Sequence, residues 1–452
     1  MKQKIFAAIC AIVIASSTLL SACTQQKPVV NTGDISTYTN PTDSTVDTAD
    51  LITNTDTIYT YANSAIYTVG DVDFVATTKG IGIVEPGKKI RMLNNQKTTS
   101  HVTVIGDTVY YTVINTVNDA ESLDVNGDIF PTKFAQCDCW SMNTDGSNPK
   151  KLFSYFGNGW VIYRQDNTVF YIDETSFEEV AVPEKGIYKI GSPVLKLRKI
   201  DLTTGKSETI APIYSDHPGG LIWGSTCVWY ASACIDGDIV IASTGMEGGT
   251  YIYDIADNEF IKPDHGVGCL IEPTRDGNLY AFKYVYKEPE DDDFLDSSYY
   301  ELSRYNSDSN SFEPLGFKSY NNIGSGIKYG NNGIMFETYE NGYLFTYTPE
   351  EGVKVYMNDA INYSDGIFCD EDNNIACISS EWHDDTDTYQ YLLTDYTNPE
   401  NVTSVTLKEF NIRNNYSMSI GANTVIGLYT PASTNKSVPA NFEYSDYTIV
   451  YR

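Results

Sequence analysis

The sequence has few basic residues and few histidines. It carries 30 lysines and arginines against 60 acidic residues, which gives a formal net charge of −30. Binding of nucleic acid needs a basic face that neutralises phosphates, so this function is excluded. None of the four histidines is spaced from a cysteine, or from another histidine, as a zinc site requires. We therefore expect no metal at the close pair Cys137 and Cys139.

The sequence also lacks the motifs of several enzyme classes. It has no G-x-S-x-G turn between a strand and a helix, no phosphate-binding P-loop and no dinucleotide fingerprint. No window after residue 23 shows a sustained helical period. Two carboxylates at a fixed separation suffice for glycoside hydrolysis, but 60 acidic residues form such pairs by chance. Their presence is no support for an enzyme.

The N-terminus predicts export. Lys2 and Lys4 precede an apolar run at 5–14, and small residues lead to the sequence LSAC that ends at Cys23. This order is typical of a signal peptide, and the apolar run is too short to span a bilayer comfortably. The ending resembles the bacterial lipobox, whose cysteine is lipidated and becomes the first residue. We predict a signal peptide at 1–22 and a lipid anchor at Cys23; the alternative is an ordinary signal peptide with a coincidental cysteine.

Three regions follow from this reading. Residues 23–54 are rich in threonine, aspartate and asparagine and predict a flexible, lipid-anchored tether; residues 55–452 predict one folded domain. The protein is expected in the cell envelope, facing outside the cytoplasm, and as a monomer. Removing Cys10 and Cys23 leaves seven cysteines, so at least one thiol is unpaired in a monomer. Cys369 and Cys377 flank a turn and are candidates to meet across a hairpin.

Short alternating segments predict an all-β domain. Tyrosine is abundant, at 35 residues, and favours half-buried strands. Strands are predicted at 107–114, 238–243, 278–286, 333–339 and 447–452. Asn-Gly and Asp-Gly dipeptides between such segments supply residues that tolerate positive φ in tight turns.

A repeated hairpin predicts the architecture. Seven hairpins share a turn flanked by strand-like segments, and their turn markers are Gly87, Gly146, Gly205, Asn258, Asn310, Gly352 and Asn398. The markers are separated by intervals that run from 42 residues (Asn310 to Gly352) to 59 residues (Gly87 to Gly146). A four-stranded repeat of roughly 40–50 residues is typical of a β-propeller blade. We predict a single β-propeller, with eight blades favoured and seven as the alternative.

The ring is expected to close through its two ends. The tail from Asn411 supplies about three strands and no eighth hairpin, and residues 55–62 are predicted to add the missing strand. Insertions at 116–134, 174–192 and 287–298 depart from a compact repeat.

A resemblance supports the propeller. The pair Tyr110-Tyr111, followed by WSMNTDGSNPKKL at 140–152, resembles the YWTD-like propeller repeat of an uncharacterised family common in bacterial lipoproteins. The same segment is similar to the repeat of TolB-type propellers. One blade matches well and the others match in outline. The resemblance implies a fold and carries no catalytic residue with it.

Two acidic segments are candidates for calcium. Asp124, Asn126 and Asp128 alternate around Gly127 but lack the following bidentate glutamate, and a simple turn is the other reading. The run at 288–294 lacks the spacing of a calcium loop and is favoured as a solvated insertion. We expect no other cofactor. The five tryptophans and many tyrosines are expected between blades, although such rings can also stack on sugars.

Three functions remain open. The first is a membrane-anchored, surface-displayed module that binds a protein, a peptide or a glycan at one end of the ring, where loops vary most. The second is a polysaccharide hydrolase or lyase with carboxylates at the channel mouth, and the third is a scaffold component of an envelope complex. A non-enzymatic binding module is favoured over an enzyme. A cluster of perturbed carboxylates would favour the enzyme.

Overall fold

A computed structural model of the chain describes most of residues 65–452. The undescribed positions within this range are 97, 124–128, 157–159, 175–176, 183–185, 192–194, 211–224, 236–237, 246–248, 262–267, 272–273, 286–298, 321–322, 324–326, 339–342, 358–363, 384–387, 411–415 and 430–445. In the described residues every regular element is a β-strand. They include no helix long and apolar enough to cross a membrane.

The strands form eight sheets, numbered here in chain order. Sheet 1 contains β1 (Ile66–Val69), β2 (Val72–Thr77), β3 (Gly80–Val84) and β4 (Arg91–Met92). Sheet 2 contains β5 (Thr98–Ile105), β6 (Thr108–Leu123), β7 (Ile129–Asn143) and β8 (Lys150–Phe156), with β11 (Phe177–Val182) and β12 (Gly186–Gly191) added. Sheet 3 contains β9 (Trp160–Gln165), β10 (Thr168–Glu174), β13 (Leu195–Asp201) and β14 (Ser207–Thr209). Sheet 4 contains β15 (Ser225–Ile235), β16 (Asp238–Gly245), β17 (Gly249–Asp254) and β18 (Glu259–Ile261).

The second half of the chain repeats the pattern. Sheet 5 contains β19 (Gly268–Ile271), β20 (Tyr280–Val285), β21 (Tyr299–Asn306) and β22 (Ser311–Ser319). Sheet 6 contains β23 (Ile327–Tyr329), β24 (Gly333–Thr338), β25 (Tyr343–Thr348) and β26 (Gly352–Met357). Sheet 7 contains β27 (Ser364–Cys369), β28 (Ile375–His383), β29 (Thr388–Asp395) and β30 (Thr403–Thr406). Sheet 8 contains β31 (Tyr416–Ile420), β32 (Thr424–Tyr429) and β33 (Asp446–Tyr451).

The repeated hairpin of the sequence is the turn between the third and fourth strands of each sheet. All seven predicted hairpins occupy this position, in sheets 1 to 7. Six of the seven turn markers adopt positive φ, from 47° at Asn310 to 91° at Gly146. Asparagine and glycine adopt this conformation at the least steric cost, so local turn chemistry determines where each hairpin falls. The predicted all-β class and four-stranded repeat are confirmed.

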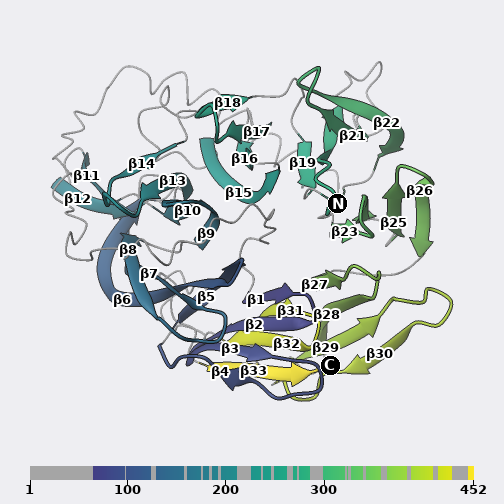
Figure 1. The fold of residues 1–452 in the computed structure, drawn as a ribbon, viewed down its shortest axis with the longest axis horizontal. Coiled ribbons are helices and arrows are strands. Elements are labelled where there is room, and N and C mark those ends of the chain that lie inside the picture. Colours follow the sequence, from purple (N-terminus) through teal and green to yellow (C-terminus); the bar gives the residue numbers. More distant parts are fainter. Residues whose placement is uncertain are drawn as a thin grey trace.

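Hydrophobic clusters lie between neighbouring sheets around the whole ring. Sheets 2, 3 and 4 share one cluster, and separate clusters join sheets 1 and 2, 4 and 5, 5 and 6, 6 and 7, 7 and 8, and 8 and 1. The first strand of a sheet lies beside the first strand of the next, as β1 beside β5 and β27 beside β31. Figure 1 shows the sheets following one another around a ring with these strands innermost. The fold is a single β-propeller.

A buried carboxylate joins the last sheet to the first. Asp73 of β2 is fully buried, and one of its oxygens accepts hydrogen bonds from Thr68 Oγ1 (2.7 Å) and Ala422 N (2.9 Å). The other oxygen accepts from Asn423 N (2.8 Å) and Thr424 Oγ1 (2.9 Å). Three of the four donors are at the start of β32: Ala422 and Asn423 lie in the turn before it, and Thr424 is its first residue. This one side chain therefore links the two ends of the described chain through three hydrogen bonds.

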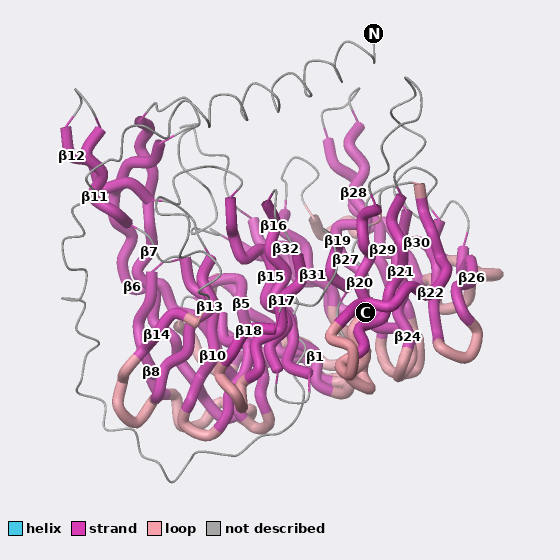
Figure 2. Tube along the Cα trace, turned by 90° about the horizontal axis from the view of Figure 1, so that it is seen from above, coloured by secondary structure: helices cyan, strands magenta, loops and turns pink. Residues whose placement is uncertain are grey.

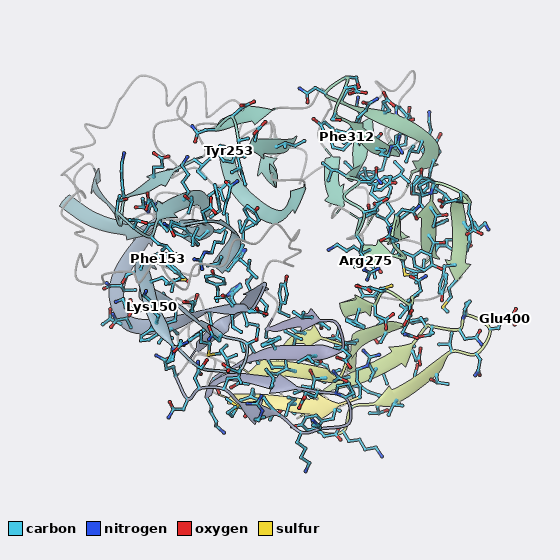
Figure 3. The ribbon with its side chains drawn as sticks, in the orientation of Figure 1. Lys150, Phe153, Tyr253, Arg275, Phe312 and Glu400 are labelled. Atoms are coloured by element: carbon cyan, nitrogen blue, oxygen red, sulfur yellow. The ribbon has the colours of Figure 1, made fainter. Side chains whose placement is uncertain are left out.

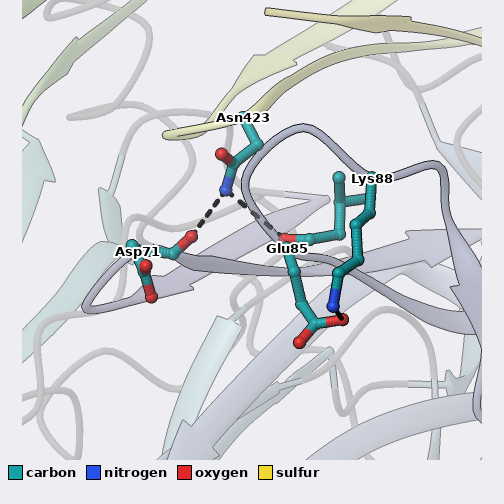
Figure 4. A network of polar contacts seen from close by, with 5 residues as sticks. Asp71, Glu85, Lys88 and Asn423 are labelled. Atoms are coloured by element: carbon teal, nitrogen blue, oxygen red, sulfur yellow. Dashed lines mark hydrogen bonds and ion pairs between the residues drawn. The ribbon is translucent and has the colours of Figure 1, made fainter.

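Further contacts reinforce this closure. The side-chain nitrogen Nδ2 of Asn423 donates to the backbone carbonyls of Asp71 (2.6 Å), in the turn between β1 and β2, and of Val84 (3.4 Å), in β3 (Figure 4). Ala65 N donates to Ser419 Oγ at 3.1 Å. Residues 55–62, predicted to complete the last sheet, lie outside the described residues. Because sheet 8 has three described strands, the number of complete blades stays a prediction.

The two ends of the ring differ. In antiparallel sheets of this order, the turns between first and second strands, and between third and fourth, lie at one end, which we call the short-turn end. The connections between second and third strands, and between sheets, lie at the other, the long-connection end. Figure 2 shows short turns at the bottom, opposite β11 and β12.

Candidate functional site

Two insertions meet at the long-connection end. β6 and β7 pair from Thr108↔Asn143 out to Leu123↔Ile129, well beyond the last residue that pairs with β8, Gln136. The insertion in sheet 3 folds into the hairpin β11–β12, paired from Val182↔Gly186 to Phe177↔Gly191. These distal segments, residues 117–135 and 177–191, are called the hairpin extension below.

The hairpin extension is one sheet built from two neighbouring blades. β12 runs parallel to β6, with Ile190 opposite Glu121, so the strand order is β11-β12-β6-β7. Figure 2 shows these strands projecting at the end opposite the short turns. Sequence reasoning located both insertions but not their pairing. Alternating residues in FEEVAV (177–182) and GIYKIG (186–191) indicate two strands, whereas no local pattern identifies a strand from another blade as their partner.

The predicted site residues fall outside the described part of the chain. Cys23 precedes it, and the calcium candidates Asp124, Asn126 and Asp128 lie between the paired residues Leu123 and Ile129. The acidic run 288–294 and the segment 55–62 are also outside it. In the residues that the structure describes, no group of three or more histidine, cysteine or carboxylate side chains is arranged to hold a metal ion.

The short-turn end is a network of hydrogen bonds between neighbouring sheets. The guanidinium of Arg275, on the inner side of the ring in Figure 3, donates to the carbonyls of Gly330 (2.5 Å) and Cys369 (2.8 Å). Gly330 N donates in turn to Asn373 Oδ1 at 2.5 Å. One arginine of sheet 5 therefore ties the turns of sheets 6 and 7. These hydrogen bonds at the short-turn end join three neighbouring sheets.

Four cysteines have described side chains, and none of these four is in a disulfide. The predicted meeting of Cys369 and Cys377 is wrong, because strand pairing places Cys369 opposite Ile375 and Cys377 opposite Ile367. They are out of register by two residues, and neither is in a disulfide. Cys137 and Cys139 are buried in the cluster shared with sheet 3. Burial raises the pKa of the Cys369 thiol to about 11 and raises that of Cys139 further, so both are protonated at neutral pH.

Two tryptophans occupy the gaps between sheets, as expected. Trp140 packs against the cluster of sheets 1 and 2, and Trp160 is buried between sheets 2 and 3. The ring of His101 stacks on Trp160 with centroids 5.0 Å apart and planes 9° from parallel. Burial lowers the pKa of His101 to about 4, so this imidazole is neutral at physiological pH. The side chains of the other three tryptophans lie outside the described set.

One carboxyl group meets part of the criterion for an enzyme. Burial raises the pKa of Glu337 on β24. Glycoside hydrolysis needs a second carboxyl group at a fixed distance. Glu337 by itself is no cluster of perturbed carboxylates.

Neither the protein-family models nor the curated protein sequences give a match to this chain. Similar solved structures include TolB from Acinetobacter baumannii (11% identity, TM-score 0.32, covering 76% of this chain and 78% of TolB). The β-propeller domain of the Trilobed protease from Pyrococcus furiosus is also similar (11%, TM-score 0.36, 78% and 98%). So is the acylaminoacyl peptidase of Pyrococcus horikoshii (12%, TM-score 0.42, 86% and 64%). This chain thus spans less than two thirds of that peptidase.

All three TM-scores lie below 0.5, so the class of this protein rests on its own sheets. Eight sheets that pack side by side around a ring, with matching hairpins in seven of them, define a β-propeller. Fold alone does not determine function in this class.

Proposed function

We propose that this protein is a lipid-anchored, extracytoplasmic β-propeller that binds a protein, a peptide or a glycan at its long-connection end. The observation that supports the proposal most is the hairpin extension. Two adjacent blades contribute insertions to a single sheet that the ring itself does not need. Loops and insertions on a rigid scaffold are where binding residues concentrate. The short-turn end, by contrast, is engaged in contacts between sheets.

The N-terminal sequence supports the anchor. A basic start, an apolar run and LSAC at Cys23 together indicate lipidation and export. Two acyl chains on one diacylglycerol anchor durably where a single chain does not. With a net charge of −30, the domain is not attracted to anionic lipid, so the lipid must provide membrane attachment.

Removing the hairpin extension should abolish ligand binding and leave the ring folded. Residues 117–135 and 175–194 are each replaced by Asn-Gly. Thr116 pairs with Gln136, and Glu174 pairs with Leu195, so a two-residue turn closes each hairpin. The full chain in detergent is applied to glycan and peptide arrays beside the wild type. The thermal midpoint serves as the folding control, with single replacements to separate the two insertions. Array signals of equal strength in both proteins, or no signal from the wild type, would contradict the proposal.

Replacing Cys23 with serine should release the protein from the membrane. The change removes the thiol proposed to carry the lipid and alters no residue of 65–452. Detergent-phase partitioning of the expressed protein measures the effect, and Cys10→Ser is the matched control because Cys10 lies within the predicted signal peptide. We expect Cys23→Ser in the aqueous phase and Cys10→Ser in the detergent phase. Retention of Cys23→Ser in the detergent phase would overturn the lipobox interpretation.

A further inference from the structure

The outermost strand of sheet 5 is irregular in a way that exposes an aromatic ring. β22 pairs with β21 at Ser303↔Pro314 and again at Glu301↔Lys318. Leu302 alone therefore lies opposite three residues, 315–317. Gly316 within them has φ = 83°, and a Cβ there would have no neighbour within 4 Å. Irregularities of this kind re-aim side chains and are common next to functional sites.

The segment after this irregularity is held by the core. Phe317 packs between sheets 5 and 6, with its ring centroid 5.4 Å from those of Phe336 and Phe345. Because the core holds Phe317, it also restrains the backbone of the residues that follow, which include Lys318 and Tyr320. Lys318 and Tyr320 lie at the long-connection end, because β22 ends at Ser319 and Tyr320 begins the connection to sheet 6. Tyr299 lies at the same end, because it is the first residue after the connection between β20 and β21.

Tyr320 presents its ring to solvent. Its relative exposure is 67%, the highest of the large apolar and aromatic side chains in the described residues. Its ring meets that of Tyr299 edge-on, with centroids 5.9 Å apart and an interplanar angle of 62°. Tyr299 is only 8% exposed and supports Tyr320 from behind. An aromatic face held in place at its edge loses little entropy when it binds a flat, apolar surface.

A charged pair lies against Tyr299, the ring on which Tyr320 rests. Lys318 Nζ lies 4.4 Å from the ring centroid of Tyr299, donates to its hydroxyl (3.1 Å), and lies 3.6 Å from Glu301 Oε1. The lysine remains half-exposed and the glutamate is mostly buried. The ammonium carries three donors and the carboxylate accepts, so hydroxyl groups above this pair would find both kinds of partner. Its net charge is zero.

We propose that Tyr320, with Lys318 and Glu301 beside it, forms a subsite that stacks one sugar ring of a neutral glycan. A sugar ring has an apolar C–H face for the tyrosine and hydroxyl groups for the charged pair. Aromatic contact area with a few placed polar groups is the usual composition of a ligand site. An acidic glycan is disfavoured, because the chain carries a net charge of −30 and the run 288–294 precedes Tyr299. The inference rests on the proposed function in taking the long-connection end as the ligand-facing end.

The test is calorimetric titration of the full chain in detergent with cellohexaose, chitohexaose and mannohexaose, and with a hexagalacturonate as the acidic comparison. We expect at least one neutral sugar to bind and the acidic one not to bind. Tyr320→Ala should weaken that binding by about tenfold, equivalent to ~1.4 kcal/mol. Tyr320→Phe keeps the ring and should stay within about twofold of the wild type, since the stacking face is unchanged. Val405→Ala is the matched control and should have no effect, because Val405 is a similarly exposed side chain (63%) on the outer strand of sheet 7.

Several outcomes would overturn the subsite. They are no binding of any neutral hexasaccharide, binding that Tyr320→Ala leaves unchanged, or preference for the hexagalacturonate. The variant that lacks the hairpin extension distinguishes a failure of this inference from a failure of the proposed function. Array binding of peptides that needs the extension, without any sugar binding, refutes the subsite and leaves the proposed function standing. Sugar binding that needs Tyr320 but survives removal of the extension supports the subsite and refutes the extension as the binding site.

Discussion

Replacing Asp73 with alanine is expected to lower the free energy of unfolding by about 3–5 kcal/mol, out of a typical total of 5–15. The carboxylate is fully buried and accepts four hydrogen bonds, three of them from residues 422–424 at the far end of the chain. Removing it leaves the amides of Ala422 and Asn423 and the Thr424 hydroxyl without their acceptor. An unsatisfied buried donor such as the Thr424 hydroxyl costs about 1–3 kcal/mol, and the partly buried backbone donors of Ala422 and Asn423 add to this cost. The last sheet then keeps its bonds through Asn423 Nδ2 and Ser419 to the first sheet but loses the three that end on Asp73.

Urea unfolding of the full chain in detergent measures this change. The matched control is Asp71→Ala, because Asp71 is exposed in the neighbouring turn and contributes its backbone carbonyl, not its carboxylate, to the closure. The control should stay within about 0.5 kcal/mol of the wild type. Asp73→Asn should also be strongly destabilised, since an amide group would direct N–H groups at other donors. If Asp73→Ala unfolds like the control, the ring does not depend on this carboxylate.

Acid is expected to destabilise the protein through His101. Burial against Trp160 lowers the pKa of the folded imidazole to about 4 from its ordinary value of 6.5. Between these two values the unfolded chain binds a proton that the folded protein does not. The stability that His101 contributes is therefore fully present above pH 6.5 and falls as the pH falls towards 4. Over this window the free energy of unfolding decreases by about 3 kcal/mol. Below pH 4 the folded imidazole is protonated too, and this source of loss ends.

His101→Phe isolates this contribution. Phenylalanine retains an aromatic ring for Trp160 and has no proton to bind. The many carboxylates also titrate as the pH falls, but they do so in both proteins, so the difference between the two unfolding curves reports His101 alone. We expect the difference to change by about 3 kcal/mol between pH 7 and pH 4. Parallel curves over that range would show that His101 is not the buried neutral group inferred from the structure.

Most of the fold could be predicted from the sequence because the features that determine it are local. Period-two alternation marks strands such as β16 and β24, and glycine or asparagine at positive φ marks the hairpin between third and fourth strands. These signals depend on a few consecutive residues. They located the seven hairpins and the three-stranded tail of sheet 8. The insertions that form the hairpin extension were also recognisable, since each interrupts a repeat of regular length.

Pairing between distant segments was decided only by the tertiary structure. Asp73 closes the ring with residues about 350 positions away, and nothing in the sequence around it distinguishes this aspartate from the other acidic residues. β12 joins β6 because neighbouring blades bring two insertions to the same end of the ring. Tyr320 directly follows β22 and is exposed, whereas Tyr299, with the same side chain, is buried at the start of the neighbouring strand. A sequence pattern reports what each residue prefers on average, and the energy of a hydrogen bond or of burial is set by the neighbours that the fold supplies.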